Sequence, residues 1–252
     1  PIGRKKIVTP PPTKVLAEKH NISVLQPEKL LDVKSKLSDV DCQLFVVAAY
    51  AKIIPKEILE IPRLGTIGIH PSLLPKYRGA TPIQTAILNG DEKTGTTLFL
   101  MDEKIDHGPI LENRETPITN RNYKELEKEL AELSANLLIE TLPSIEEKIK
   151  NAKPQDESLA TYTKKFSARG GSAEGGKTED GYVASKDLEA AQSVGGKVAI
   201  EIDRKIRALN PEPGTWTLQN EKRMKILGAG LTPEGKLKLK KIQFESKKPQ
   251  II

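Results

Sequence analysis

The stretch GTIGIHPSLLPKYRGATPIQTAILNG covers residues 65–90. Its pattern predicts a strand over 66–70, then a loop rich in proline and glycine, then a helix over 81–88 with Pro82 in its first turn. Strands that alternate with helices are typical of an open α/β sheet. Such sheets bind their ligands at the loops just beyond the C-terminal ends of the strands. The stretch therefore predicts both a fold class and the place of a site.

Further strands and helices are predicted on both sides of this stretch. Residues 44–49, LFVVAA, form a continuous apolar run that is typical of a strand buried on both faces of a parallel sheet. Four leucines between 126 and 137 repeat at the spacing of one helix face, which predicts a helix capped near Asn122 and interrupted at Pro143. Shorter elements complete the pattern, with strands over 22–25, 96–101 and 110–115 and helices over 13–20 and 185–192.

The composition changes toward the C-terminus. Residues 167–182 are rich in glycine and poor in apolar groups, which predicts a flexible connection. Beyond Asn210 the pattern becomes short strands, over 215–218, 224–227 and 237–244, which predicts a small OB-like β-barrel. We therefore expect an open, Rossmann-like, mostly parallel sheet followed by this barrel. The expected divisions are a catalytic domain over 1–155, a linker over 156–183 and a C-terminal β domain over 184–252.

The net charge of +6 is unevenly distributed. Residues 221–248 hold nine Lys or Arg against three Glu, and residues 1–20 hold five against one. Basic ends could bind a phosphate backbone, although on charge alone a solvated lysine-rich surface is the better explanation. The single cysteine, Cys42, excludes an internal disulfide and a cysteine-rich zinc site. No apolar run approaches 18 residues, which argues against a membrane span, and the single cysteine fits a reducing compartment, so we expect a cytoplasmic protein.

Two residues near predicted strand ends suggest acid–base chemistry. His70 ends the strand at 66–70, and Asp106 follows one helix and one strand later. Adjacent parallel strands would bring the two side chains together, and a carboxylate beside an imidazole orients the ring and stabilises its charged form. The alternative is that His70 only packs at the strand end. Asp102, Glu103 and His107 are consistent with ordinary loop residues, and His20 with a surface position.

Several of these segments resemble the folate-dependent formyltransferases. SLLPKYRGATPIQ at 72–84 resembles their signature loop, and DHGP at 106–109 resembles their second motif. VVAAYAKIIP at 46–55 is similar to the segment whose main chain lines their folate pocket. IRALNPEPGTW at 206–216 resembles the entry into the C-terminal domain of the members that act on methionyl-tRNA, and GRKK at 3–6 resembles the inserted loop by which these members hold the tRNA acceptor end.

The resemblance implies transfer of a formyl group from 10-formyltetrahydrofolate to the amino group of initiator methionyl-tRNA, without a metal, by a monomeric protein. His70 would assist proton transfer and stabilise the oxyanion, and Asp106 would orient His70. The implied folate-binding residues are Tyr50, Ala51, Lys52, Ile53, Ser72, Leu73, Leu74, Pro75 and Asp102. The implied tRNA-binding residues are Arg4, Lys5, Lys6, Lys236, Lys238 and Lys240.

The chain departs from the family pattern at two places. The family has an asparagine two residues before the histidine, as an oxyanion donor, and this chain has Gly68. Loss of one such donor typically lowers the rate about 10²–10³-fold, so we expect impaired activity, a substituting water or an altered residue. The family's first strand, first helix and second strand would precede Pro1, and its last strand would follow Ile252. The resemblance therefore implies an incomplete catalytic domain that is marginally stable alone.

Two alternatives stay open at this point. A sugar-nucleotide N-formyltransferase would share the catalytic core but would not need the basic C-terminal region, so its substrate binding would be insensitive to salt. A catalytically inactive protein that binds folate or tRNA would explain Gly68, and binding without turnover would identify it.

Overall fold

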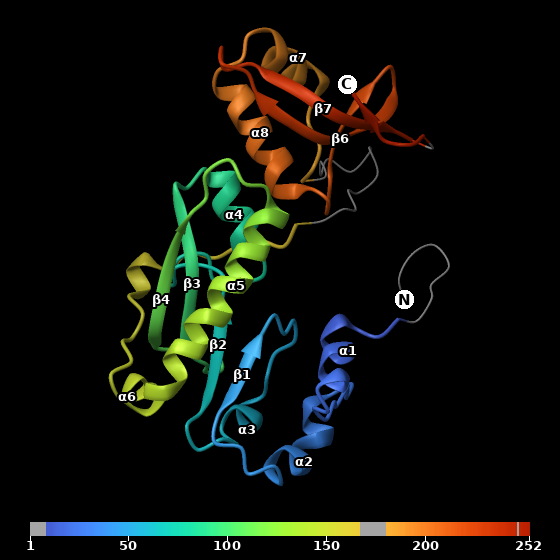
Figure 1. Ribbon diagram of the computed structural model, residues 1–252. Coiled ribbons are helices and arrows are strands. Elements are labelled where there is room, and N and C mark those ends of the chain that lie inside the picture. The colour runs from blue at the N-terminus through green and yellow to red at the C-terminus, as the bar shows by residue number, and fades with distance from the viewer. Residues whose placement is uncertain (1–8, 167–179, 246) are drawn as a thin grey trace. The chain divides into compact units, whose positions relative to one another are not determined.

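The computed structural model describes residues 9–166, 180–245 and 247–252 (Figure 1). These residues divide into two compact units at Cys42 and Gln43. Three residues of the predicted tRNA contacts, Arg4, Lys5 and Lys6, lie outside the described residues, as does most of the glycine-rich segment 167–182.

The first unit is helical. It contains α1 (Pro12–Lys19), the 3₁₀ helix η1 (Leu30–Val33) and α2 (Lys34–Ser38), so the helix predicted over 13–20 is confirmed. The strand predicted over 22–25 is wrong, since these residues have no regular secondary structure. A strand requires a neighbouring segment to complete its ladder of hydrogen bonds, and the described residues supply none at this position.

The larger unit is built on a four-stranded sheet in the order β1-β2-β3-β4. Its strands are β1 (Phe45–Ala48), β2 (Thr66–His70), β3 (Lys93–Leu100) and β4 (Ile110–Pro117). The four predicted strands and the α/β class are confirmed. The expected parallel pairing holds for β1 and β2, whereas the pairs β2–β3 and β3–β4 are antiparallel. A short loop over 101–109 joins β3 to β4, and a connection of that length permits only antiparallel neighbours.

Two short helices flank the strands. They are α3 (Lys56–Leu59) and α4 (Pro82–Asn89), which has Pro82 at its first turn as predicted. The helix α4 ends at Gly90, whose φ of 72° is the left-handed conformation that glycine adopts without strain.

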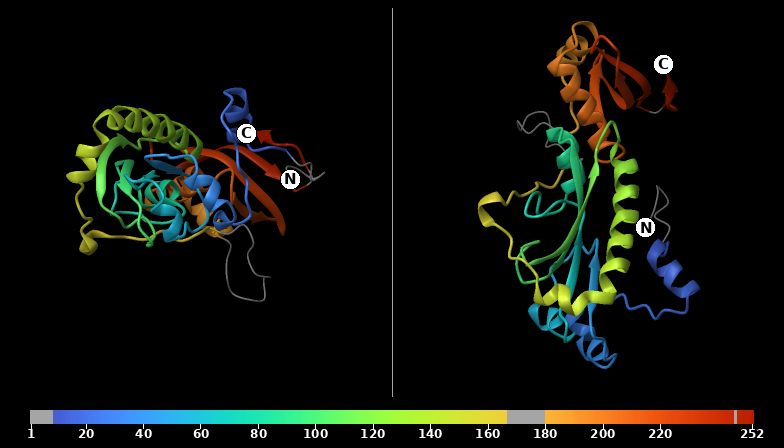
Figure 2. Two further views of the ribbon diagram at one scale, coloured as in Figure 1. Left: turned by 90° about the horizontal axis from the view of Figure 1, so that it is seen from below. Right: turned by 60° about the vertical axis from the view of Figure 1, so that its left-hand side comes forward.

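The long helix α5 (Tyr123–Thr141) packs against β3 and β4 and covers one face of the sheet (Figure 2). The core on this face contains Ile67, Leu98 and Leu137, each at most 1% exposed. Side chains alternate along a strand, so Gly68 and His70 belong to the opposite face. That opposite face is free of the helix and is where the candidate site lies.

The start of α5 has the predicted cap. The Asn122 side chain accepts hydrogen bonds from the main-chain N–H of Lys124 at 2.9 Å and of Glu125 at 3.2 Å. The Glu125 carboxylate accepts from the Asn122 N–H at 2.9 Å, which completes a capping box. The predicted interruption at Pro143 is also confirmed, since η2 (Leu142–Ser144) and α6 (Ile145–Lys150) follow α5.

Replacing Asn122 with Ala removes this cap and is expected to lower the free energy of unfolding by about 1 kcal/mol. Equilibrium unfolding in urea measures the change. The exposed residue Asn120 provides the matched control, because Asn120→Ala lies outside the helix and should change stability by less than about 0.5 kcal/mol. Equal losses in the two variants would show that the cap does not stabilise α5.

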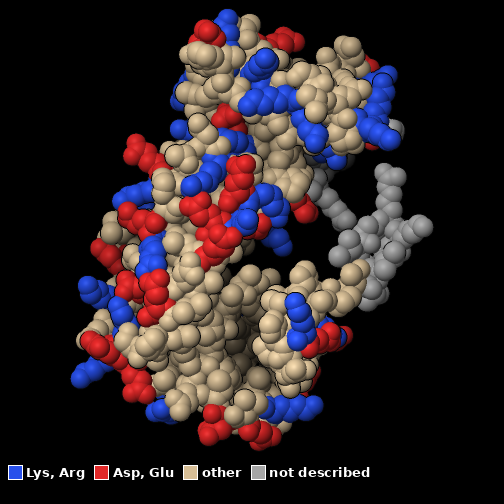
Figure 3. Space-filling view, in the orientation of Figure 1, with Lys and Arg blue, Asp and Glu red and all other residues tan. Residues whose placement is uncertain are grey.

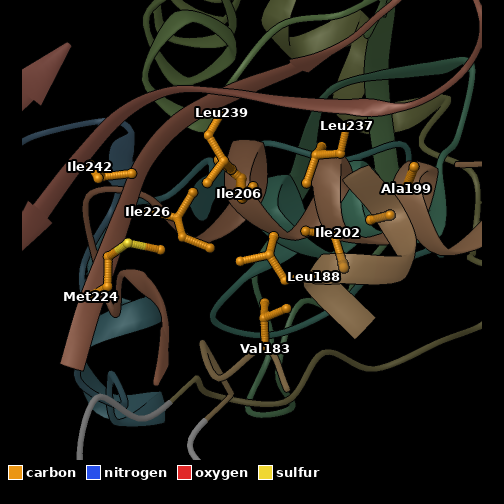
Figure 4. Close-up of a cluster of buried hydrophobic side chains, with 11 residues drawn as sticks. Val183, Leu188, Ala199, Ile202, Ile206, Met224, Ile226, Leu237, Leu239 and Ile242 are labelled. Carbon is orange, nitrogen blue, oxygen red and sulfur yellow. The ribbon is translucent and has the colours of Figure 1, made fainter. Parts of the chain in front are cut away.

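The C-terminal part of this unit contains a second, antiparallel sheet in the order β5-β6-β7-β8. Its elements are α7 (Ser185–Ser193), α8 (Lys197–Leu209), β5 (Thr215–Gln219), β6 (Lys222–Leu231), β7 (Leu237–Phe244) and β8 (Gln250–Ile251). The predicted small β region and the helix over 185–192 are confirmed. Apolar side chains of α7, α8, β6 and β7 form its core, among them Leu188, Ile202, Ile206, Ile226 and Leu239 (Figure 4).

The end of α8 connects this core to the helices that flank the first sheet. Ala208 and Leu209 are at most 1% exposed and pack with Ile87 of α4 and Leu126 of α5. The proposed division of the chain into 1–155, 156–183 and 184–252 stays a prediction.

Candidate active site

His70 lies at the end of β2 and is 6% exposed. Its Nε2 lies 2.9 Å from the main-chain oxygen of Tyr77. Because a carbonyl oxygen only accepts, Nε2 carries the hydrogen of this bond. The other ring nitrogen, Nδ1, lies 3.6 Å from Oδ2 of Asp106. The loop after β2 thus fixes the orientation of the ring and leaves Nδ1 facing a carboxylate.

Asp106 reaches His70 by a route that the sequence pattern does not show. The loop between β3 and β4 begins beside the start of β2, where the Met101 N–H donates to the Thr66 oxygen at 2.8 Å. It then returns along the strand, so that Asp106 meets His70 at the strand's other end. There the Gly79 N–H donates to Asp106 Oδ2 at 2.7 Å, which fixes the oxygen that faces the imidazole.

Sequence reasoning missed Arg78, which is 0% exposed although it carries a charge. Its guanidinium donates to both Glu157 carboxylate oxygens, at 3.0 and 2.6 Å, and to Gln155 Oε1, at 3.1 and 2.8 Å. The hydrogen bonds to Glu157 raise the pKa of Arg78, and Arg78 lowers the pKa of Glu157. The available signal was an arginine directly before Gly79 in a loop made mainly of small and apolar residues.

Arg78 holds a segment of residues 155–163, which we call the strap. The Arg78 N–H donates to the Thr161 oxygen at 2.9 Å, and the Thr163 N–H donates to the Arg78 oxygen at 2.8 Å. At the start of the strap, Gln155 Nε2 donates to the main-chain oxygens of Asp106, at 2.9 Å, and Gly108, at 2.8 Å. The strap therefore contacts both loops that form the site.

Gly68 is buried and lies directly opposite Phe99 in the β2–β3 pair. A Cβ atom at position 68 would lie 2.5 Å from two carbons of the Phe99 ring and 3.1 Å from Met101 Cγ. The ring is 2% exposed, so it fills the space in which a side chain of residue 68 would begin. Any side chain at position 68 therefore requires the ring of Phe99 to move.

The predicted folate-binding residues divide into two groups. Tyr50 and Ile53 follow β1 and are 42% and 83% exposed. Ala51 and Lys52 lie between them and are also exposed. In the loop after β2, Ser72 is 0% exposed and donates to the Lys76 oxygen at 2.6 Å.

The remaining members of this set also have defined places. Leu74 is buried and its N–H donates to Thr97 Oγ1 at 3.2 Å, whereas its neighbours Leu73 and Pro75 are half-buried. Asp102 lies in the loop after β3, where its Oδ2 accepts from His107 Nδ1 at 2.5 Å. A second imidazole–carboxylate pair thus lies in the loop that carries Asp106.

The predicted basic residues lie on and beside β7. Lys238 and Lys240 are exposed and alternate with the buried Leu237 and Leu239, and Lys236 directly precedes the strand. Lys and Arg side chains are visible over the C-terminal sheet in Figure 3.

Metal ligands and membrane-spanning helices are both absent from the described part of the chain. Among residues 9–166, 180–245 and 247–252, no group of three or more His, Cys, Asp or Glu is arranged to hold a metal ion. Over the same ranges, no helix combines the length and the apolar character needed to cross a bilayer.

His70, at the end of β2, is a buried imidazole that faces the fixed carboxylate of Asp106. Enzymes that transfer protons during group transfer use such pairs. The chain matches the Formyl transferase family over residues 2–142 and the Formyl transferase C-terminal domain over residues 196–238. It belongs to the formyl transferase family and is a transferase.

Relatives and solved structures with named activities are also similar to this chain. The chain is 39% identical over 232 residues to a methionyl-tRNA formyltransferase of Staphylococcus epidermidis, covering 91% of this chain and 68% of the relative. A methionyl-tRNA formyltransferase structure from Clostridium thermocellum has a TM-score of 0.59 at 20% identity, covering 92% of each chain. WlaRD, a sugar 3N-formyl transferase solved with dTDP and 5-N-formyl-THF, also has a TM-score of 0.59 at 20% identity, covering 93% of this chain and 81% of WlaRD.

Proposed function

We propose that this protein transfers the formyl group of 10-formyltetrahydrofolate to the amino group of initiator methionyl-tRNA. The observation that carries the proposal is the pair of His70 Nδ1 and Asp106 Oδ2 at 3.6 Å, with His70 just before the segment 72–84 and Asp106 in the segment 106–109 that resemble the formyltransferase motifs. The chain is 39% identical to a methionyl-tRNA formyltransferase in an alignment that covers 91% of its length, and this similarity supports the choice of acceptor. Because charged tRNA is the substrate, the proposal places the protein in the cytoplasm.

In the proposed reaction the methionyl amine attacks the formyl carbon, and the carbonyl oxygen becomes an oxyanion. The bond from that carbon to N10 of the folate then breaks, and the proton lost by the amine is transferred to N10. The products are formylmethionyl-tRNA and tetrahydrofolate. Since Tyr77 holds Nε2 of His70, Nδ1 is the nitrogen that can accept the proton, and the cationic ring then stabilises the oxyanion by its charge. Asp106 orients the ring and stabilises its cationic form.

Folate binding is assigned to the loops around this pair. Tyr50, Ala51, Lys52 and Ile53 after β1, Ser72 to Pro75 after β2, and Asp102 after β3 are the proposed folate-binding residues. Their members after β1 are exposed and are proposed to contact the folate directly, whereas the buried Ser72 and Leu74 are proposed to act by shaping the loop. The reaction as proposed requires no metal ion.

The choice between acceptors is tested by formyl transfer from 10-formyltetrahydrofolate to charged initiator methionyl-tRNA and, in parallel, to an amino-sugar nucleotide. Turnover only on the tRNA supports the proposal. Turnover only on the sugar nucleotide would favour the alternative that the WlaRD fold suggests. Binding of folate and tRNA without turnover would identify the inactive homologue, for which the missing side chain at Gly68 is the specific argument.

The lysines of β7 are proposed to contact the tRNA backbone. Replacing both Lys238 and Lys240 with Ala is expected to weaken tRNA binding and to reduce the slope of log K against log[salt] by roughly 1.5. Binding titrations at several salt concentrations measure the slope. The exposed Lys128 on α5 provides the control, since Lys128→Ala should leave the slope unchanged. A slope that is the same in the double variant and the parent would remove β7 from the tRNA interface.

A further inference from the structure

The main chain of Asp106 is held by a side chain from a distant part of the sequence. Gln155 Nε2 donates to the Asp106 oxygen at 2.9 Å and to the Gly108 oxygen at 2.8 Å. Gln155 Oε1 in turn accepts from Nε and Nη2 of Arg78, at 3.1 and 2.8 Å. The Gln155 amide oxygen thus accepts from Arg78, and its two N–H groups donate to the loop that carries Asp106.

Arg78 supports the same carboxylate from a second direction. Its chain neighbour Gly79 donates its N–H to Asp106 Oδ2 at 2.7 Å. The Arg78 main chain is fixed by the strap through Thr161 and Thr163, and its buried guanidinium is fixed by Glu157. The position of the Gly79 N–H is therefore set by the same buried arginine that orients Gln155.

Asp106 requires this support. Its φ of 48° lies in the left-handed region, which aspartate adopts less readily than glycine, so the surrounding contacts help to hold this conformation. The loop that carries it also spans the length of β2 between Thr66 and His70. A loop released from Gln155 would relax this residue and move the carboxylate away from the imidazole.

We propose that Arg78 and Gln155 are positioning residues that hold Asp106 against His70. The inference rests on the proposed function, because holding Asp106 in place affects the reaction only if Asp106 and His70 act in formyl transfer. The contacts themselves can be tested without activity.

The variant Gln155→Glu distinguishes the hydrogen bonds to Arg78 from those to the loop that carries Asp106. Glutamate still accepts from Arg78, but its oxygens cannot donate to the carbonyls of Asp106 and Gly108 when it is ionised. In the variant the Gly79 amide should exchange with deuterium at least about tenfold faster, because its acceptor Asp106 is released. The Thr163 amide, which donates to the Arg78 oxygen, should be unchanged and shows that the strap is still in place.

Unchanged deuterium exchange at the Gly79 amide would overturn the proposal, whatever the activity of the variant. If Gln155→Glu fails to fold, as the loss of Thr163 protection would show, Gln155→Met provides the same comparison without a new charge. With this variant too, faster exchange at Gly79 supports the proposal and unchanged exchange overturns it.

The catalytic consequence is tested by a double-mutant cycle. Gln155→Glu should lower kcat about 10–100-fold with KM for the folate changed less than about twofold, and it should have no further effect in an Asp106→Asn background. Leu159→Ala, an exposed position on the same strap, should behave as the parent. Additive effects of the two substitutions would overturn the positioning role. If Asp106→Asn alone left kcat unchanged, the proposed function of the pair would fail, and the Gly79 exchange would still decide whether Gln155 holds the loop.

Discussion

Replacing Asp106 with Asn, or His70 with Asn, is expected to lower the rate of formyl transfer about 10²–10⁴-fold. Asp106→Asn preserves the size of the side chain, His70→Asn leaves a smaller polar side chain, and each removes the group that carries or stabilises the proton. In Asp106→Asn the amide oxygen could still accept the Gly79 N–H, so the loop should stay in place while the charge beside His70 is lost. The rate is best measured in single-turnover experiments with the enzyme in saturating excess over methionyl-tRNA and with saturating folate, because these report on the chemical step.

The control for this experiment is Asp187→Asn, a change of the same chemistry at an exposed position of α7. It should leave the single-turnover rate within about twofold of the parent, as surface substitutions usually do. Melting temperatures of all variants exclude unfolding as the cause of a loss. If Asp106→Asn and His70→Asn both retained rates within about threefold of the parent, proton transfer by this pair would not contribute to the reaction.

The features that sequence predicts best here are local ones. The leucine spacing and Asn122 are sufficient for α5 and its start, because a helix satisfies its hydrogen bonds within one segment. Strand positions 45–48 and 66–70 were also readable from apolar runs. The strand predicted over 22–25 failed because a strand depends on a partner elsewhere, and apolar residues alone do not supply one.

The site shows the same distinction. His70 and Asp106 could be proposed from motifs, but the expected reason for their meeting, adjacent parallel strands, is wrong because β2 and β3 are antiparallel. Gln155 and Arg78 are 77 residues apart, and their contact follows from the path of the strap. No periodicity or spacing in the sequence encodes that path, so the residues that hold Asp106 in place could only be found in the structure.

Gly68 has different meanings in the sequence and in the structure. In the sequence it is the loss of a side-chain donor at a position where the family has asparagine. In the structure it is one half of a packed pair, since the ring of Phe99 lies where a Cβ would be. A large residue opposite a glycine fills the volume that the glycine leaves. Restoring asparagine therefore requires a change at both positions.

Gly68→Asn alone is accordingly expected to lower the free energy of unfolding by about 1–3 kcal/mol, because the 2% exposed ring of Phe99 must move. Thermal and urea unfolding measure this loss. Gly68→Ala adds only the Cβ and should account for most of it, which separates the steric effect from that of the amide. If Gly68→Asn alone had the stability of the parent, the Phe99 ring would be able to move aside at no cost in free energy.

Combining Gly68→Asn with Phe99→Leu should relieve the conflict. Leucine ends at its Cδ atoms and lacks Cε1 and Cζ, the two ring carbons that lie 2.5 Å from the position of the new Cβ. If the new amide then donates to the oxyanion, formyl transfer should become up to about 10²–10³-fold faster than in the parent. Phe99→Leu alone, which opens space without adding a donor, should not accelerate the reaction. A stable double variant with the rate of Phe99→Leu would mean that this site stabilises the oxyanion through His70 without help from position 68.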